Sequence, residues 1–161
     1  MQASFPNLKL AYSPEFLVER KRFEDFANQR ILVVGSDHGD VANLVFEHHK
    51  IAGVLLEDNT FHVGNTEAEM VKYTKNNFYA LKVVFANQMH DICEALGIEW
   101  SVVKEIITAP QDQTIGDSHL EPIMGLMRGF GGKCLPKDTL ALRELARGFG
   151  VDYQFLDALQ N

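Results

Sequence analysis

One long apolar segment dominates this chain. Residues 66–97 read TEAEMVKYTKNNFYALKVVFANQMHDICEALG. Apolar side chains recur in the segment at helical intervals, and it ends on a glycine, which often closes a helix; they are Met70, Val71, Phe78, Leu81, Val84, Phe85, Ile92 and Leu96. The pattern predicts a single helix of about 30 residues, on the order of 45 Å long. Thr66 and Glu69 match the Thr-x-x-Glu capping box that begins many helices.

A helix of this length is unusual in a small domain. Its apolar residues cover several sides, so we expect a second copy of the chain to pack against it. Cys93 lies between apolar neighbours of this segment and is predicted to be a core residue.

The first third of the chain alternates between strand and helix patterns. Residues 30–35 form a continuous apolar run closed by a glycine, as in a buried strand. A helix at 40–50 and a short strand at 61–63 follow. Before them we expect a strand at 8–12 that leads into a helix capped by Ser13, with Pro14 in its first position. This order is typical of the end of an open α/β sheet.

The last third is predicted to be helical, without further strands. The apolar spacing indicates helices at 101–108, 137–148 and 152–159. A polar, glycine-containing loop connects the first two of them, from residue 109 to 134.

Composition limits the class of protein. The chain has 161 residues, with 46% hydrophobic and 23% charged side chains, which is typical of a globular protein and unlike a disordered one. A net charge of −7 argues against binding to nucleic acid or to an anionic membrane surface. No apolar run reaches the length of a membrane span, and no export signal begins the chain. Two cysteines make no disulfide framework, so we expect a reduced, cytoplasmic protein.

The segment with the most unusual chemistry is Gly129–Asp138, which reads GFGGKCLPKD. Its glycines allow the backbone to approach a ligand closely. Cys134 directly precedes a helix that Pro136 marks, and Lys133 and Lys137 flank it. A helix N-terminus and nearby cations favour the thiolate, which is the nucleophilic form of cysteine. The alternative is a glycine-rich turn with a buried structural cysteine.

Two pairs of polar residues have helical spacing. Glu15 and Glu19 are four apart in the expected first helix, where acids also simply complement the helix dipole. Lys72 and Asn76 are four apart in the long helix and could both donate hydrogen bonds to a developing oxyanion. The alternative for Lys72 is a solvated lysine at the edge of the helix.

The sequence favours neither a metal site nor a dinucleotide site. A group of acids and histidines follows the strand at 30–35, but a second cluster with ligand spacing is missing, so caps and surface histidines are the simpler interpretation; its members are Asp37, His38, Asp40, His48 and His49. No strand runs into a Gly-x-Gly-x-x-Gly turn followed by a helix, which is the usual cradle for a dinucleotide phosphate.

Three motifs together resemble the nucleotide-sugar 6-dehydrogenase family, which includes UDP-glucose and GDP-mannose dehydrogenases. They occur in the family's order across almost the whole chain. They are Ser13-Pro14-Glu15-Phe16-Leu17 followed by Glu19, then Ala68-Glu69-Met70-Val71-Lys72-Tyr73 with Asn76, then Gly129-Phe130-Gly131-Gly132 through Cys134-Leu135-Pro136-Lys137-Asp138.

The resemblance implies the fold class and the domains. It implies an α/β fragment, the end of a Rossmann-like sheet, followed by an all-α central dimerisation domain built on one long helix. Residues 1–65 would be the C-terminal part of the NAD-binding domain. Residues 66–161 would be the central helical domain that carries the cysteine, with a homodimer formed through the helix at 66–96.

The resemblance also implies an activity, the NAD-dependent oxidation of the sugar C6 alcohol to a carboxylate. Cys134 would attack the C6 aldehyde to give a thiohemiacetal, which is oxidised to a thioester and hydrolysed. Lys72 and Asn76 would hold the C6 oxygen, while Asp138 and Glu15 would position water or move its proton. The remaining roles are substrate binding by Phe16, Leu17, Glu19, Gly129, Phe130 and Gly131, together with Glu15, Lys72 and Asn76, and cofactor binding by Glu19 and Lys137.

This chain departs from the family pattern at several positions. Arg20 follows Glu19 where relatives usually have glycine, and Lys133 replaces a common serine. Thr114 stands where many relatives have an arginine that reaches into the partner's active site. Two alternatives to an enzyme part therefore remain open: a non-catalytic dimerisation or nucleotide-sugar-binding module, and a separate cysteine hydrolase. The hydrolase lacks a histidine at a recognisable position.

Overall fold

The computed structural model describes residues 7–110, 115–116, 118–121, 129–150 and 157–158. The chain divides into two compact units, Met1–Lys72 and Tyr73–Asn161.

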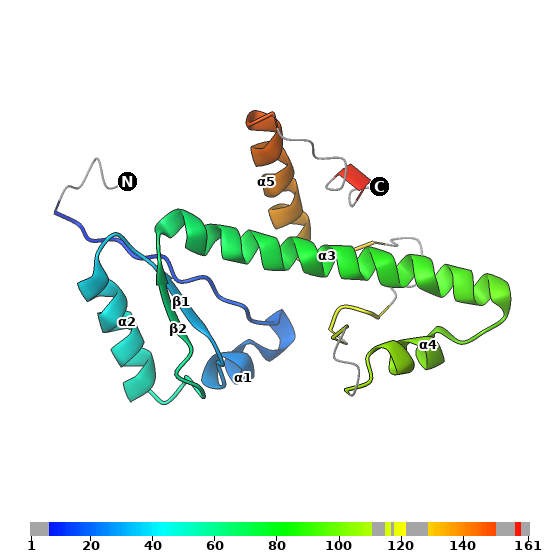
Figure 1. The fold of residues 1–161 in the computed structure, drawn as a ribbon, viewed down its shortest axis with the longest axis horizontal. Coiled ribbons are helices and arrows are strands. Elements are labelled where there is room, and N and C mark those ends of the chain that lie inside the picture. Colours follow the sequence, from blue (N-terminus) through cyan, green and yellow to red (C-terminus); the bar gives the residue numbers. More distant parts are fainter. Residues whose placement is uncertain (1–6, 111–114, 117, 122–128, 151–156, 159–161) are drawn as a thin grey trace. The chain divides into compact units, whose positions relative to one another are not determined.

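The first unit is built on two parallel strands. β1 (Leu32–Gly35) pairs with β2 (Thr60–Val63), in a register that sets Leu32 opposite Thr60. α2 (Gly39–Ile51) connects the strands and lies alongside them (Figure 1). A parallel pair requires such a crossover, and a helix supplies it. The predicted strands at 30–35 and 61–63 and the predicted helix at 40–50 are confirmed.

The core of this unit lies between β1 and α2. All four residues of β1 are buried, as its uninterrupted apolar sequence predicts. Leu32, Val34 and Ala42 form the buried cluster, and Val45, Phe46 and Leu55 pack against it.

Two predictions for the start of the chain are wrong. In place of a strand at 8–12, only Tyr12 pairs with β1, through two 2.8 Å backbone hydrogen bonds with Gly35. Ser13 does not cap a helix, because its Oγ donates to the Val33 carbonyl oxygen at 3.0 Å. The helical segments begin later, with the 3-10 turn η2 (Glu19–Lys21) and α1 (Arg22–Ala27). Hydrogen bonds to β1 have replaced the local cap that the Ser-Pro pair suggested.

The long helix is confirmed as α3 (Asn65–Leu96), which has 32 residues. Its C-terminus also follows the prediction: Gly97 has a φ of +70°, and the Ile98 N–H donates to the Cys93 carbonyl oxygen at 3.0 Å. This arrangement satisfies carbonyl groups that a helix end otherwise leaves free. The predicted capping box is wrong, because the Ala68 N–H already bonds to Gly64 O at 3.1 Å. Thr66 therefore lies inside the helix.

The second unit contains most of α3 together with α4 (Trp100–Ile107) and α5 (Leu135–Gly148). These confirm the predicted helices at 101–108 and 137–148, whereas most of the one at 152–159 lies outside the described residues. The buried cluster consists of Ala86, Cys93, Trp100 and Leu120, so the core assignment of Cys93 is confirmed. Around Ala80, α3 and α5 share a second cluster, with Leu81, Val84, Phe130, Leu135, Leu142 and Ala146.

Within the described part of the chain, no helix combines the length and the apolar character that a membrane crossing requires.

Candidate active site

Cys134 stands at the beginning of α5. Cys134 is the N-cap residue of the helix and is exposed, and Pro136 lies in the first turn. The Asp138 N–H donates to the Cys134 carbonyl oxygen at 2.9 Å, which places Asp138 one turn along the helix. The sequence predicted this arrangement, and the exposure of Cys134 excludes the alternative of a buried structural cysteine.

The glycine-rich turn before Cys134 depends on backbone conformation. Gly129 and Gly132 have φ values of +148° and +81°, which other residues rarely adopt. A Cβ at Gly129, Gly131 or Gly132 would meet no atom of the described residues within 4 Å, so these residues leave the space beside the turn open. Phe130 does not extend into that space, because it packs against the Ala80 cluster.

Asp138 is a buried carboxylate, 1% exposed. Asn76 Nδ2 on α3 donates to its Oδ2 at 2.6 Å, and the Lys137 ammonium lies 3.1 Å from its Oδ1. The structure thus brings together two predicted site residues, Asn76 and Asp138, that are 62 positions apart in the sequence. Lys137 itself is 67% exposed.

Asn77 is a further residue at this junction, and the sequence pattern did not predict it. It is 4% exposed, and its Nδ2 donates to Tyr73 O at 2.9 Å and to Asp138 O at 3.4 Å. Asn77 Oδ1 and Thr139 Oγ1 are buried and have no hydrogen-bond partner among the residues that the structure describes. Nothing in the local sequence distinguishes Asn77 from a solvated helix residue, since its burial follows from the packing of α5.

In the first unit, Lys72 and Glu15 form an ion pair. Lys72 Nζ lies 2.8 Å from Glu15 Oε1, with side chains 17% and 54% exposed. The prediction that Glu15 and Glu19 share a helix face is wrong, because Glu15 precedes η2. The contact with Lys72 places Glu15 next to α3 within the first unit. Lys72 is therefore not the freely solvated lysine of the alternative interpretation.

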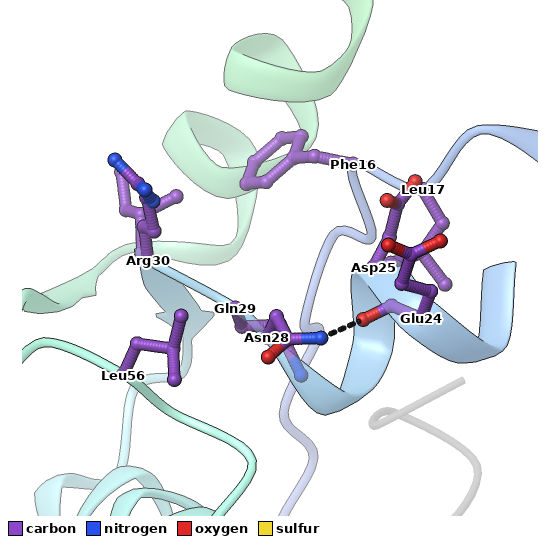
Figure 2. Close-up of a pocket in the computed structure, with 9 residues that line it drawn as sticks. Phe16, Leu17, Glu24, Asp25, Asn28, Gln29, Arg30 and Leu56 are labelled. Carbon is purple, nitrogen blue, oxygen red and sulfur yellow. Dashed lines mark hydrogen bonds between the residues drawn. The ribbon is translucent and has the colours of Figure 1, made fainter. Parts of the chain in front are cut away.

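Phe16 and Leu17 line a hollow of about 590 Å³ in the first unit. Figure 2 shows them with polar side chains of α1 and with residues that flank the strands; the remaining lining residues are Glu24, Asp25, Asn28, Gln29, Arg30, Ile31 and Leu56. Part of the polar lining is used internally. Asn28 Nδ2 donates to Glu24 O at 2.8 Å, and the Val18 N–H donates to Asp25 Oδ2 at 2.8 Å. The volume is in the range of small-molecule sites.

The other predicted positions are less informative. Glu19 belongs to η2, and its side chain lies outside the description. Thr114 also lies outside the described residues, while Arg20 and Lys133 are exposed.

The turn between β1 and α2 does not fit the pyrophosphate of a dinucleotide. A Cβ on Gly35, the glycine that closes β1, would lie 2.7 Å from Ala68 Cβ, so the chain itself fills the space that a phosphate would need. At the start of α2, Asp40 would repel an anion, and the Lys9 ammonium bonded to it holds the pKa of its carboxyl below the usual value. No phosphate cradle exists at this turn.

The histidines near α2 are used in hydrogen bonds. His48 Nδ1 and His49 Nδ1 lie 2.7 and 2.8 Å from carbonyl oxygens one turn earlier. Among the described residues, the only group whose potential metal-ligand atoms lie close together is His90, Asp91 and Glu94, and both carboxylates are exposed. These residues are not the ones that the sequence analysis considered.

Comparison with known proteins adds to these observations. The profile of the UDP-glucose/GDP-mannose dehydrogenase family, central domain, matches residues 66–161. The chain belongs to this family. The UDP-glucose/GDP-mannose dehydrogenases that resemble it include UDP-glucose 6-dehydrogenase of Rickettsia prowazekii (strain Madrid E), which is 34% identical over 95% of this chain and 34% of that protein. GDP-mannose 6-dehydrogenase of Pseudomonas putida is 31% identical over 93% of this chain and 32% of that protein.

Solved structures of the UDP-glucose/GDP-mannose dehydrogenases share the fold. A UDP-glucose dehydrogenase from Pyrobaculum islandicum superposes with a TM-score of 0.80 at 32% identity, over 94% of this chain and 33% of that chain. The chain spans about a third of the length of the curated relatives that it matches. Family membership and the predicted fold class, an α/β fragment followed by helices built on one long helix, are thus confirmed.

Proposed function

We propose that this chain carries the sugar-binding and cysteine part of an NAD-dependent nucleotide-sugar 6-dehydrogenase of the UDP-glucose type, which oxidises the C6 alcohol to a carboxylate. The observation that carries the proposal is the start of α5. There Cys134 is exposed at the helix N-terminus, and the Asp138 carboxylate is held one turn later by Asn76.

The proposed reaction of Cys134 is capture of the C6 aldehyde. Sulfur forms a bond to C6, the carbonyl π bond opens, and the thiol proton ends on the C6 oxygen, which gives a thiohemiacetal. Covalent capture keeps a reactive intermediate in place. The thiohemiacetal is the species from which the thioester and then the carboxylate derive.

Lys72 and Asn76 are the proposed donors to the C6 oxygen. An amide NH₂ has two protons and an ammonium has three. Asn76 gives one proton to Asp138, and Lys72 gives one to Glu15. The second Nδ2 proton of Asn76 and the positive charge of Lys72 are proposed to stabilise an oxygen that gains negative charge. Asp138 and Glu15 are proposed to orient water or to move its proton.

Substrate contacts are proposed for the loop after Ser13 and for the glycine-rich turn. Phe16 and Leu17 line the hollow of the first unit, and the backbone at Gly129 and Gly131 is open. Phe130 supports the turn from the core side. Glu19 and Lys137 remain the proposed residues next to the cofactor.

NAD would accept hydride in this reaction, as the family assignment implies. Because the turn after β1 does not fit its pyrophosphate, we assign to this chain the binding of the sugar nucleotide and the capture of the aldehyde, and toward the cofactor only the proposed positions of Glu19 and Lys137.

The proposal is tested by the rate at which iodoacetamide alkylates Cys134, with Cys93→Ala as the background. The C6 aldehyde of UDP-glucose should slow the reaction at least tenfold, and UDP-glucose should slow it less, because only the aldehyde bonds to sulfur. A comparison with the C6 aldehyde of GDP-mannose tests which of the two sugar nucleotides the site prefers. An alkylation rate that the aldehydes leave unchanged would contradict the proposal.

A second candidate function, a dimerisation module, is favoured by one stripe of α3. Phe78, Phe85 and Ile92 are 56%, 39% and 51% exposed, and they are seven residues apart, so they lie on one side of the helix. We propose that a second copy of the chain covers this stripe. Phe85→Glu should then reduce the sedimenting mass to that of one chain. Phe149→Glu is the matched control, since Phe149 is 78% exposed and lies outside α3. If the chain forms a dimer but its Cys134 gains no protection from the aldehydes, dimerisation is the one proposed function that the results support.

We also propose the domain boundary between residues 65 and 66. The start of the family match at residue 66 supports it, whereas the compact units divide seven residues later, after Lys72. The fragment 66–161 should then fold by itself, which its helical circular dichroism and cooperative unfolding would test.

A further inference from the structure

The junction of α3 and α5 contains a buried amide to which the proposed reaction gives no role. We propose that Asn77 is a positioning residue, which fixes Asp138 and the turn that carries Cys134 against α3. The effect of Asn77 on the reaction of Cys134 rests on the proposed function, whereas its effect on the structure of the junction does not.

The hydrogen bonds of Asn77 connect two helices. Its Nδ2 donates to Tyr73 O, within α3, at 2.9 Å and to Asp138 O, in the first turn of α5, at 3.4 Å. Both partners are carbonyl oxygens, so the NH₂ end of the amide must be the end that faces them. The Asn77 side chain therefore links the main chain of α3, at Tyr73, to the main chain of α5, at Asp138.

Asp138 is thereby fixed through three of its groups. Its carbonyl oxygen accepts from Asn77, its N–H donates to Cys134 O at 2.9 Å, and its carboxylate accepts from Asn76 at 2.6 Å. Since Asn76 and Asn77 are neighbours in α3, a rotation or slide of α5 would lengthen both contacts together. The carboxylate contact fixes only the side chain of Asp138, whereas the contact with Asn77 fixes its main chain.

The other end of the amide indicates that its N–H groups are what matter. Asn77 Oδ1 is buried and accepts no hydrogen bond from any described residue, and such an atom destabilises the fold relative to a leucine of similar size. The two N–H contacts offset this cost, and an apolar side chain cannot make them.

The test compares Asn77→Leu with Asn87→Leu in the full chain. Asn87 lies in the same helix, is 6% exposed, and is ten residues away, or about 15 Å along the axis. The measured quantity is the hydrogen-exchange rate of the Asp138 amide, relative to that of Val103 in α4. Asn77→Leu should raise this ratio about tenfold because the start of α5 opens locally. Asn87→Leu should leave it unchanged.

A spectroscopic signature separates positioning from general destabilisation. In Asn77→Leu, the side-chain NH₂ resonances of Asn76 should move toward those in Asp138→Leu, where the carboxylate is absent. If Asn77→Leu does not fold, Asn77→Ser replaces it, since serine is too short to reach both carbonyl oxygens. An unchanged exchange ratio and unchanged Asn76 resonances in a folded variant would overturn the proposal.

The same variants separate this inference from the proposed function. If wild-type Cys134 gains no protection from the C6 aldehydes, the proposed function fails while the exchange result stands. If protection is present, Asn77→Leu should weaken it at least fivefold, and Asn87→Leu should not.

Discussion

Two acidic side chains, Glu15 in the first unit and Asp138 in the second, each contact α3 in different surroundings. Glu15 is 54% exposed and pairs with the ammonium of Lys72. Asp138 is 1% exposed and accepts from the neutral amide of Asn76. Water can replace the first contact when it breaks, but it cannot easily replace the second. The buried contact should therefore matter far more for stability, although the exposed one joins two full charges.

The largest expected effect follows from removing the amide donor of Asp138. Asn76→Leu should lower the free energy of unfolding by about 3 kcal/mol, because it leaves a buried carboxylate without its closest donor. Urea unfolding followed by circular dichroism measures the change. The double variant Asn76→Leu/Asp138→Leu should regain most of it. A loss below about 1 kcal/mol would mean that Lys137 or water satisfies the carboxylate equally well.

A packing test in the first unit comes next. Gly35→Ala should cost about 2 kcal/mol, because the new Cβ would lie 2.7 Å from Ala68 Cβ and 2.9 Å from Gly64 O. Gly39→Ala is the matched control, since among the described residues its Cβ would meet only the His62 ring, at 3.7 Å. The two melting curves should differ clearly. Equal stabilities would show that the start of α3 can shift away from β1.

The exposed ion pair should give a smaller effect. Glu15→Gln keeps the shape of the side chain and should cost about 0.5 kcal/mol or less, because the Glu15 carboxylate is 54% exposed and water can reach the pair. Added salt should remove most of that difference through screening. Unfolding at low and at high salt measures it. A salt-independent loss above about 1.5 kcal/mol would contradict the contrast between the two acids.

The smallest expected effect is a pH dependence in the second unit. Burial lowers the pKa of His119 from 6.5, and the Lys82 ammonium adds to this; the ring stacks on Tyr79, with centroids 4.1 Å apart. Below about pH 6.5 the unfolded chain binds more protons at this residue than the folded chain, so stability should decrease as the pH falls from there. His119→Gln should lose stability less steeply in this window. Parallel pH profiles of the two proteins would exclude the effect.

Much of the fold follows from the sequence because its causes are local. The apolar run of β1, the helical spacing of α2 and α3, and the closing Gly97 each depend on residues that are close in the chain. The position of Cys134 at the start of α5 follows for the same reason, since Pro136 and the preceding glycines indicate where that helix begins. The family resemblance is also local in origin, since it rests on the three short motifs that begin at Ser13, Ala68 and Gly129.

The tertiary structure decided the rest. The Ser-Pro pair suggested a helix, but Ser13 bonds to Val33 and residues 13–18 stay non-helical. The sequence predicted substrate as the partner of Asn76 and predicted no role for Asn77. In the structure, both side chains donate hydrogen bonds to Asp138 of α5. The physical reason is that a local pattern records propensity and periodicity, whereas burial and hydrogen-bond partners depend on residues as many as 62 positions away.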